Sequence, residues 1–180
     1  MALIKAQQAI NEFHDTRQLL LSVIANTPGI RYRELVRLTG LSNGVLAHHL
    51  KTLENSSQIR VVRQIKNKTT RYYSTNISTQ ESDILGQLRN NVPRQIIKFI
   101  LDNNLCTFTE IVEHLGKAQS TVSWHLKRLK ESGIVSVRYG EEHQLYQINK
   151  QDLVSSVLHK YRENVVDTVV DNYTEIVDEL

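Results

Sequence analysis

Two copies of the pattern His-Leu-Lys-x-Leu stand in one short chain, at residues 49–53 and 125–129. Around each copy lie small, hydroxyl, imidazole and cationic side chains, which exchange hydrogen bonds or neutralise phosphate. Side chains of these kinds recognise the base edges in a DNA groove and the phosphates beside it. The residue types at these two places therefore favour recognition of a polyanion.

No spacing in the sequence indicates catalysis. The chain has no Gly-rich phosphate loop, paired-carboxylate motif or nucleophile signature, so we predict that it is not an enzyme and uses no cofactor. Cys106 is the only cysteine, which excludes an intramolecular disulfide and a cysteine-based zinc site. A packing role is favoured over a redox role for Cys106. His49 and His125 have no second ligand at metal-site spacing, so we expect them to pack beside the core and predict no metal site.

Charge is distributed unevenly along the chain, whose formal net charge is +3. Residues 16–76 hold ten Lys/Arg and two Glu, a balance of +8, whereas residues 91–149 hold seven basic and six acidic residues, a balance of +1. Residues 163–180 hold six acidic residues and no Lys or Arg. A polyanion is therefore attracted to the first half of the chain and repelled by its tail.

The sequence is a tandem duplication. Residues 34–61 align with residues 110–137 without a gap. The recurring residues include Gly40, His49 and Lys51, which return as Gly116, His125 and Lys127. Beyond this stretch the second copy is predicted to be three residues shorter, with "YSTN" at 73–76 matching "YQIN" at 146–149.

Each copy predicts the same order of elements. An apolar helix (16–27 or 93–104) is followed by a short helix that ends at a glycine suited to a C-cap. A third helix begins near Ser42 or near residues 118–120, and two β-rich runs then mark a hairpin. This order is a winged helix, so the fold class is mainly α with small β-hairpins (α+β), in tandem winged helix-turn-helix domains.

Five segments follow from these boundaries. They are an N-terminal helix at 1–15, a winged-helix domain at 16–76, a linker helix at 77–91, a second winged-helix domain at 92–149 and a long C-terminal dimerisation helix at 150–180.

The third helix of each copy combines a buried stripe with a surface suited to DNA. Leu46, Leu50 and Leu53 follow the spacing of one buried face. The opposite face carries small, hydrogen-bonding and cationic side chains: Gly44, Ala47, His48 and Lys51 in the first copy, and Ser120, Ser123, Trp124 and Lys127 in the second. A helix with such a face fits a major groove, although any amphipathic helix has a polar outer face. Trp124 is expected either to contact DNA or to pack against a neighbouring domain.

The segment "QSTVSWHLKRLKESGIVSVR" (119–138) resembles the recognition helix and first wing strand of ArsR/MarR-type winged-helix repressors. Across residues 16–149 the chain resembles archaeal predicted transcriptional regulators with two HTH domains. The first copy departs from the pattern, with "SNGVLAHHL" at 42–50, and the cysteine motif of metal-sensing members is missing. By position, the resemblance implies DNA contacts from Asn43, Gly44, Val45, Ala47, His48, Lys51, Gln119, Ser120, Thr121, Ser123, Trp124 and Lys127.

The two hairpin tips differ in charge. The first carries Arg63, Lys66, Lys68 and Arg71, a cationic finger suited to phosphates or a minor groove, with a solvated hairpin as the alternative. Together with Arg31 and Arg33, these residues complete the predicted DNA-binding set. The second tip carries Glu141 and Glu142, so we expect the first domain to supply most of the electrostatic affinity.

The C-terminal tail is amphipathic and is predicted to form a dimer seam, with folding back onto its own domains as the alternative. The predicted dimerisation residues are Val166, Val169, Val170, Tyr173, Ile176 and Val177.

The sequence thus predicts a homodimeric, sequence-selective regulator of transcription that binds double-stranded DNA through its recognition helices and a basic wing. The alternatives are an architectural protein that coats DNA and a winged helix that serves protein interaction. No segment predicts a membrane span or a signal peptide, so we expect a cytoplasmic, nucleoid-associated protein. A small-molecule or protein effector would have to bind between domains or at the dimer seam.

Overall fold

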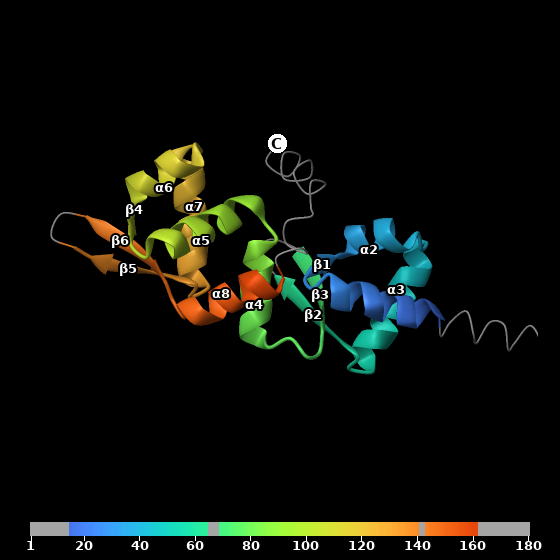
Figure 1. Ribbon diagram of the computed structural model, residues 1–180. Helices are drawn as coiled ribbons and strands as arrows, with labels where there is room; N and C mark the ends of the chain where they lie inside the picture. The colour runs from blue at the N-terminus through green and yellow to red at the C-terminus, as the bar shows by residue number, and fades with distance from the viewer. Residues whose placement is uncertain (1–14, 65–68, 141–142, 162–180) are drawn as a thin grey trace, which may run out of the picture. The chain divides into compact units, whose positions relative to one another are not determined.

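The computed structural model describes residues 15–64, 69–140 and 143–161 (Figure 1). The chain divides into two compact units, Met1–Ser78 and Thr79–Leu180, which we call the first and second units. Each unit combines helices with one three-stranded antiparallel sheet, which confirms the predicted fold class of tandem winged helix-turn-helix domains.

The first unit opens with a helix that includes residues 15–26. The short strand β1 (Ile30–Arg31) leads into α2 (Tyr32–Thr39), and α3 (Asn43–Asn55) follows after a turn. The hairpin of β2 (Ile59–Gln64) and β3 (Thr69–Ser74) completes the unit. The strand order is β1-β3-β2, so β1 and β2 flank β3.

The core of the first unit lies where the helices meet the sheet. Leu46 and Leu53 of α3 are fully buried, and Leu50 is 4% exposed, as the predicted leucine stripe requires. They pack in one cluster with Leu20, Ile24 and Leu35 from the two preceding helices. Burial of an aliphatic side chain contributes about 1.5–3 kcal/mol, so this stripe fixes which face of α3 points outward.

The second unit repeats this order and adds a helix at each end. Its elements are α4 (Thr79–Leu88), α5 (Asn91–Asn103), β4 (Cys106–Thr107), α6 (Phe108–Leu115), α7 (Gln119–Glu131), β5 (Val135–Tyr139), β6 (Gln144–Ile148) and α8 (Gln151–Lys160). Val122 and Leu129 of α7 are fully buried and Leu126 is 2% exposed. The strand order is β4-β6-β5, the same as in the first unit.

The helix-turn-helix is fixed by the residues that recur between the copies. Gly40 and Gly116 end α2 and α6 with φ of 66° and 60°, the left-handed region that favours glycine. Glu34 and Glu110 recur because each accepts a backbone N–H at the start of its helix, at 2.9 Å from Arg31 and 2.7 Å from Thr107.

Strand pairing corrects the predicted length difference between the two hairpins. Ile30 pairs with Tyr72, and Cys106, which the same alignment places opposite Ile30, pairs with Tyr146. Tyr146 therefore corresponds to Tyr72 and not to Tyr73, and the second copy is two residues shorter, not three. A slip of one residue would exchange the two faces of the strand, which is why burial rather than the local "Y-x-x-N" match sets the register.

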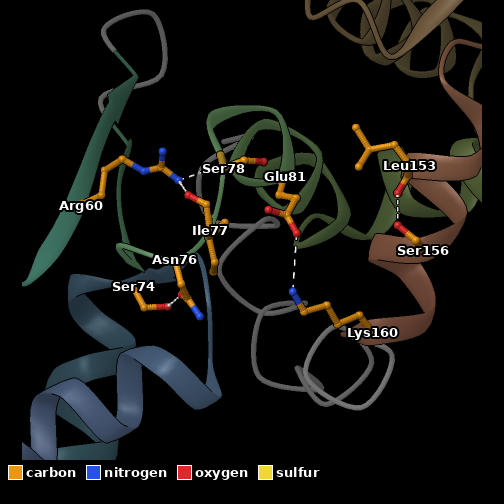
Figure 2. A network of polar contacts seen from close by, with 9 residues as sticks. All are labelled: Arg60, Ser74, Asn76, Ile77, Ser78, Glu81, Leu153, Ser156 and Lys160. Carbon is orange, nitrogen blue, oxygen red and sulfur yellow. Dashed lines mark hydrogen bonds and ion pairs between the residues drawn. The ribbon is translucent and has the colours of Figure 1, made fainter.

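Polar contacts stabilise the segment after the first hairpin and the packing of α8 on α4 (Figure 2). Arg60 of β2 donates hydrogen bonds to the carbonyl oxygens of Ile77 and Ser78, which ties down the chain as it leaves the first hairpin. Within the second unit, α4 packs against α5 and α8, and Lys160 lies 3.5 Å from Glu81. The residues predicted to form the dimer seam, 166–177, lie outside the described residues.

None of the helices in the described parts of the chain has the length and apolar character needed to cross a membrane.

Candidate nucleic-acid interface

The outward face of α3 is open along the whole helix. Gly44, Ala47, His48 and Lys51 are exposed, as are Asn43 and Val45 at its first turn. A Cβ atom at Gly44 would meet nothing within 4 Å, so packing inside the unit does not require glycine there. This end of α3 is therefore free to approach a ligand closely, and the structure brings together all six residues predicted on this helix.

The corresponding face of α7 carries one large aromatic residue. Gln119, Ser120, Ser123 and Lys127 are exposed, and Thr121 is half-buried. Trp124 is 51% exposed, with the Arg128 guanidinium 4.6 Å from its ring centroid. The predicted residues of α7 thus share one surface, on which Trp124 replaces the histidine of α3.

The first wing differs from its prediction. Arg63 is exposed, but its two guanidinium nitrogens each lie 2.7 Å from a carboxylate oxygen of Glu54 at the end of α3. These hydrogen bonds lower the pKa of Glu54 from its ordinary value. Arg63 therefore joins the wing to α3 in the unbound protein. Lys66 and Lys68 lie outside the described residues.

Arg71 does not belong to a cationic finger. Its side chain is 3% exposed, and Nη1 donates a hydrogen bond of 2.8 Å to the carbonyl oxygen of Gly29. A guanidinium held in this way supports the sheet and is not available to phosphate. The prediction was wrong here because it counted charge alone. β3 is the central strand of its sheet, and Arg71, Tyr72 and Tyr73 are all buried, so residues on both faces of this strand are covered.

The two arginines near α2 differ in exposure. Arg33 in the first turn of α2 is exposed, and so is Arg37 in the last turn of that helix, close to the HTH turn in sequence. Arg31 is half-buried in β1, where its backbone caps α2. Arg33 is exposed, as a phosphate contact requires. Arg31 has a structural role in β1 and at the start of α2 that accounts for its position without a DNA contact.

The second wing carries residues that the sequence analysis did not single out. Tyr139 at the end of β5 is 82% exposed, and Arg138 beside it is exposed. Lys130 on the last turn of α7 and Lys117 in the HTH turn are exposed as well. The alignment of the two copies contains the signal, because Lys130 and Tyr139 stand at the positions of Glu54 and Arg63.

The two recurring histidines support the core. His49 is 2% exposed, and burial lowers its pKa. His125 is half-buried, and burial followed by the charge of Arg128 lowers its pKa to about 4. Both are thus neutral near pH 7. Among the described residues no group of three or more His, Cys, Asp or Glu side chains is placed to hold a metal ion.

Two family matches cover most of this architecture. Residues 14–85 match HTH_HVO_0163_N, an N-terminal HTH domain, and residues 94–137 match the family described as "Bacterial regulatory protein, arsR family". The chain carries two helix-turn-helix domains. The second match spans the HTH domain from α5 into β5, and the first spans all of the HTH elements of the first unit. The fold of each unit is that of a helix-turn-helix domain.

A curated relative supports the same architecture. Over 140 residues the chain is 26% identical to the uncharacterized HTH-type transcriptional regulator MJ1398 of Methanocaldococcus jannaschii. The match covers 78% of this HTH chain and 35% of the relative, so the chain spans about a third of that protein's length.

Several solved structures resemble parts of the chain. HlyU from Vibrio cholerae is 24% identical with a TM-score of 0.43, and the match covers 49% of this chain and 95% of HlyU. The transcriptional repressor BigR from Xylella fastidiosa is 25% identical with a TM-score of 0.40, and the match covers 45% and 82%. The homodimeric winged helix-turn-helix domain of Mb0332 from Mycobacterium bovis is 24% identical with a TM-score of 0.39, and the match covers 53% and 82%.

Proposed function

We propose that the protein is a sequence-selective regulator of transcription that inserts α3 and α7 into major grooves of double-stranded DNA. One observation carries the proposal: each helix buries its leucine stripe and leaves the opposite face exposed, directly after an HTH turn and before a hairpin. A groove about 12 Å wide admits a helix with such a face. Small residues near the first turn of each helix allow its backbone to approach the bases.

Phosphate contacts are proposed for cations around each of these helices. In the first unit Arg33, Arg37 and Lys51 are exposed, and in the second unit Lys117, Lys127, Lys130 and Arg138 are exposed. Arg63 is paired with Glu54 and Arg71 is buried, so the first wing offers fewer cations for phosphate contacts than its sequence suggests. We therefore propose that both units contribute to electrostatic affinity, and that the first unit exceeds the second only through Lys66 and Lys68.

We further propose that the protein acts as a homodimer in the cytoplasm, where it meets chromosomal DNA. The six dimerisation residues predicted from the sequence, Val166, Val169, Val170, Tyr173, Ile176 and Val177, would form the seam. Two-fold symmetry then requires pseudo-palindromic half-sites one helical turn of about 10 bp, or a multiple of it, apart for equivalent domains. An effector, small molecule or protein, would act by shifting this spacing.

Binding of the full chain to duplex DNA tests the proposal. Genomic fragments that the protein retains are footprinted, and binding is measured from about 50 to 200 mM salt, over which several phosphate contacts predict a steep loss of affinity. Sharp protection at discrete sites supports a sequence-selective regulator. Protection that spreads with protein concentration along any fragment would favour the architectural alternative, and no binding at low salt would refute both.

Variants of the two lysines assign the contributions. Lys51→Ala and Lys127→Ala occupy the same position in the two helices, so each serves as the matched partner of the other. We expect each to weaken binding and to reduce the salt slope by about one contact. If neither changes binding, the outward faces of α3 and α7 do not contact DNA.

A further inference from the structure

The two helices proposed to enter DNA grooves differ most at one outward position. Trp124 of α7 stands where α3 has His48, since the gapless alignment of the two copies pairs these two positions. His48 presents ring nitrogens, which exchange hydrogen bonds. Trp124 presents mainly carbon, with 51% of the residue exposed on a helix whose leucines fill the core. The sole tryptophan of the chain is therefore not needed to complete that core.

The indole of Trp124 is held in place from two sides. The Arg128 guanidinium lies 4.6 Å from the ring centroid, a cation–π contact. The ring of His125 packs against it edge-on, with centroids 4.7 Å apart and an interplanar angle of 82°. Both neighbours are half-buried and so are themselves restrained. Because the indole is already ordered, it loses little conformational entropy when a ligand covers its exposed part.

The surroundings of the indole admit a nucleic-acid base edge. Ser120 and Ser123 lie on the same face of α7, and their short side chains leave the indole as the most prominent group. Lys127, one turn further, is exposed and suited to a phosphate beside the same groove. The core of a protein–protein interface is depleted of serine and lysine, whereas the exposed neighbours of this indole on α7 include Ser120, Ser123 and Lys127.

Only one base presents an apolar group in the major groove, namely the C5-methyl of thymine. We infer that Trp124 recognises thymine through this methyl group, so that the second unit makes an apolar base contact where the first unit makes a hydrogen bond through His48. The inference rests on the proposed function and adds the base class that α7 selects.

The test compares thymine with uracil, which keeps every Watson–Crick group and the O4 acceptor but lacks the methyl group. The probe is a duplex pool selected by the wild-type protein from random sequence, then copied by polymerase with either thymine or uracil. Burial of one methyl-sized group predicts about fourfold tighter binding for each contacted thymine. The wild-type protein is therefore expected to bind the thymine pool at least about fourfold better than the uracil pool.

The variants isolate the contribution of Trp124, because Val45 and Ala47 of α3 are also exposed near the bases. Trp124→His, which installs the residue of the first unit, and Trp124→Gln should each lower the thymine-to-uracil affinity ratio by about fourfold per methyl contacted. His48→Ala should weaken binding to both pools and leave the ratio unchanged. Thermal unfolding confirms that each variant is folded.

The outcomes separate the inference from the proposed function. An affinity ratio that is equal in the wild type and both Trp124 variants overturns the inference, while the DNA-binding function stands. Loss of self-association in the variants, with DNA affinity unchanged, also overturns it and makes the indole a protein contact. A wild-type protein that binds neither pool overturns the proposed function itself. Uracil interference mapping on the wild type adds a readout that needs no variant: discrete sensitive thymines support the contact.

Discussion

The first and second units share one backbone plan and differ in how the wing is joined to the helix before it. In the first unit Arg63 of β2 forms two 2.7 Å hydrogen bonds with Glu54 of α3. In the second unit the same positions hold Lys130 and Tyr139, which are both exposed. Duplication thus preserved the core and the HTH turn, while the contact between the wing and the preceding helix diverged: the first unit has an ion pair there, and the second has two exposed side chains.

The difference shows where a duplicated domain tolerates change. Gly40 and Gly116, the leucine stripes and the capping glutamates are retained because each fixes a backbone conformation or a buried face. The outward positions have no such constraint, so His48 and Trp124 differ. Substitutions at matched positions can break or sharpen this comparison, and the largest expected effects concern the shared core.

Leu53→Ala and Leu129→Ala remove equivalent fully buried side chains from the two units. Each is expected to destabilise its own unit by about 2–5 kcal/mol, because the cavity adds to the lost transfer free energy. Hydrogen exchange should show lost protection in residues 15–78 for the first variant and in residues 91–148 for the second. Equal loss in both ranges from either variant would contradict the division into two units, each with its own core.

Arg71→Met tests whether a wing arginine is structural. The change removes the hydrogen bond to Gly29 and leaves a buried carbonyl oxygen without that donor, so the free energy of unfolding should fall by about 1–3 kcal/mol. Urea unfolding measures the loss. At a temperature where the variant is folded, the salt slope of DNA binding should match that of the wild type. A reduced slope would show that this guanidinium contacts phosphate after all.

His125 predicts an acid sensitivity of the second unit. Its pKa is lowered to about 4 in the folded chain, whereas an unfolded histidine titrates near its ordinary 6.5. The unfolded state therefore binds more protons, and stability that is present above pH 6.5 is lost as the pH falls toward 4. Allowing for the partial exposure of the ring, the loss is about 1–2 kcal/mol.

His125→Gln should flatten this pH dependence, as measured by urea unfolding between pH 4 and 7. His143→Gln, an exposed histidine of the same unit, serves as the control and should leave the profile unchanged. A profile that keeps its slope without His125 would assign the acid sensitivity to another group.

Glu54→Gln has the smallest expected effect on stability and would sharpen the contrast between the wings. The exposed ion pair contributes at most about 1 kcal/mol, so unfolding should change little. Freed from the carboxylate, Arg63 can neutralise a phosphate, and the salt slope of DNA binding should steepen by about 0.9. Asp102→Asn, an exposed carboxylate at the end of α5, is the matched control. An unchanged slope would mean that Arg63 stays with α3 even when DNA is present.

Periodicity and duplication predict most of this fold. The leucine stripes, the glycine C-caps and the hairpins are local signals, so the predicted starts of the third helices agree closely with those of α3 and α7. The short strands β1 and β4 are not predicted, because a pair of residues has no periodicity and forms a strand only through the partner strand, β3 or β6.

The candidate site was less predictable than the fold. Composition marks Arg63 and Arg71 as equivalent cations, but one lies 2.7 Å from Glu54 and the other points inward to Gly29. Such partnerships join residues 9 and 42 positions apart, and no pattern in the chain encodes them. In contrast, the open faces of α3 and α7 follow directly from the stripe on the opposite side.

The pairing of β4 buries a cysteine whose reactivity can report local opening of the second unit. Cys106, the only thiol of the chain, is 1% exposed and pairs with Tyr146, where the first unit has Ile30 paired with Tyr72. A thiol-alkylating reagent reaches this sulfur when the second unit opens locally around β4. The rate of alkylation therefore measures how often that opening occurs. The unsubstituted protein thus reports local unfolding of the second unit alone, because the first unit has no thiol.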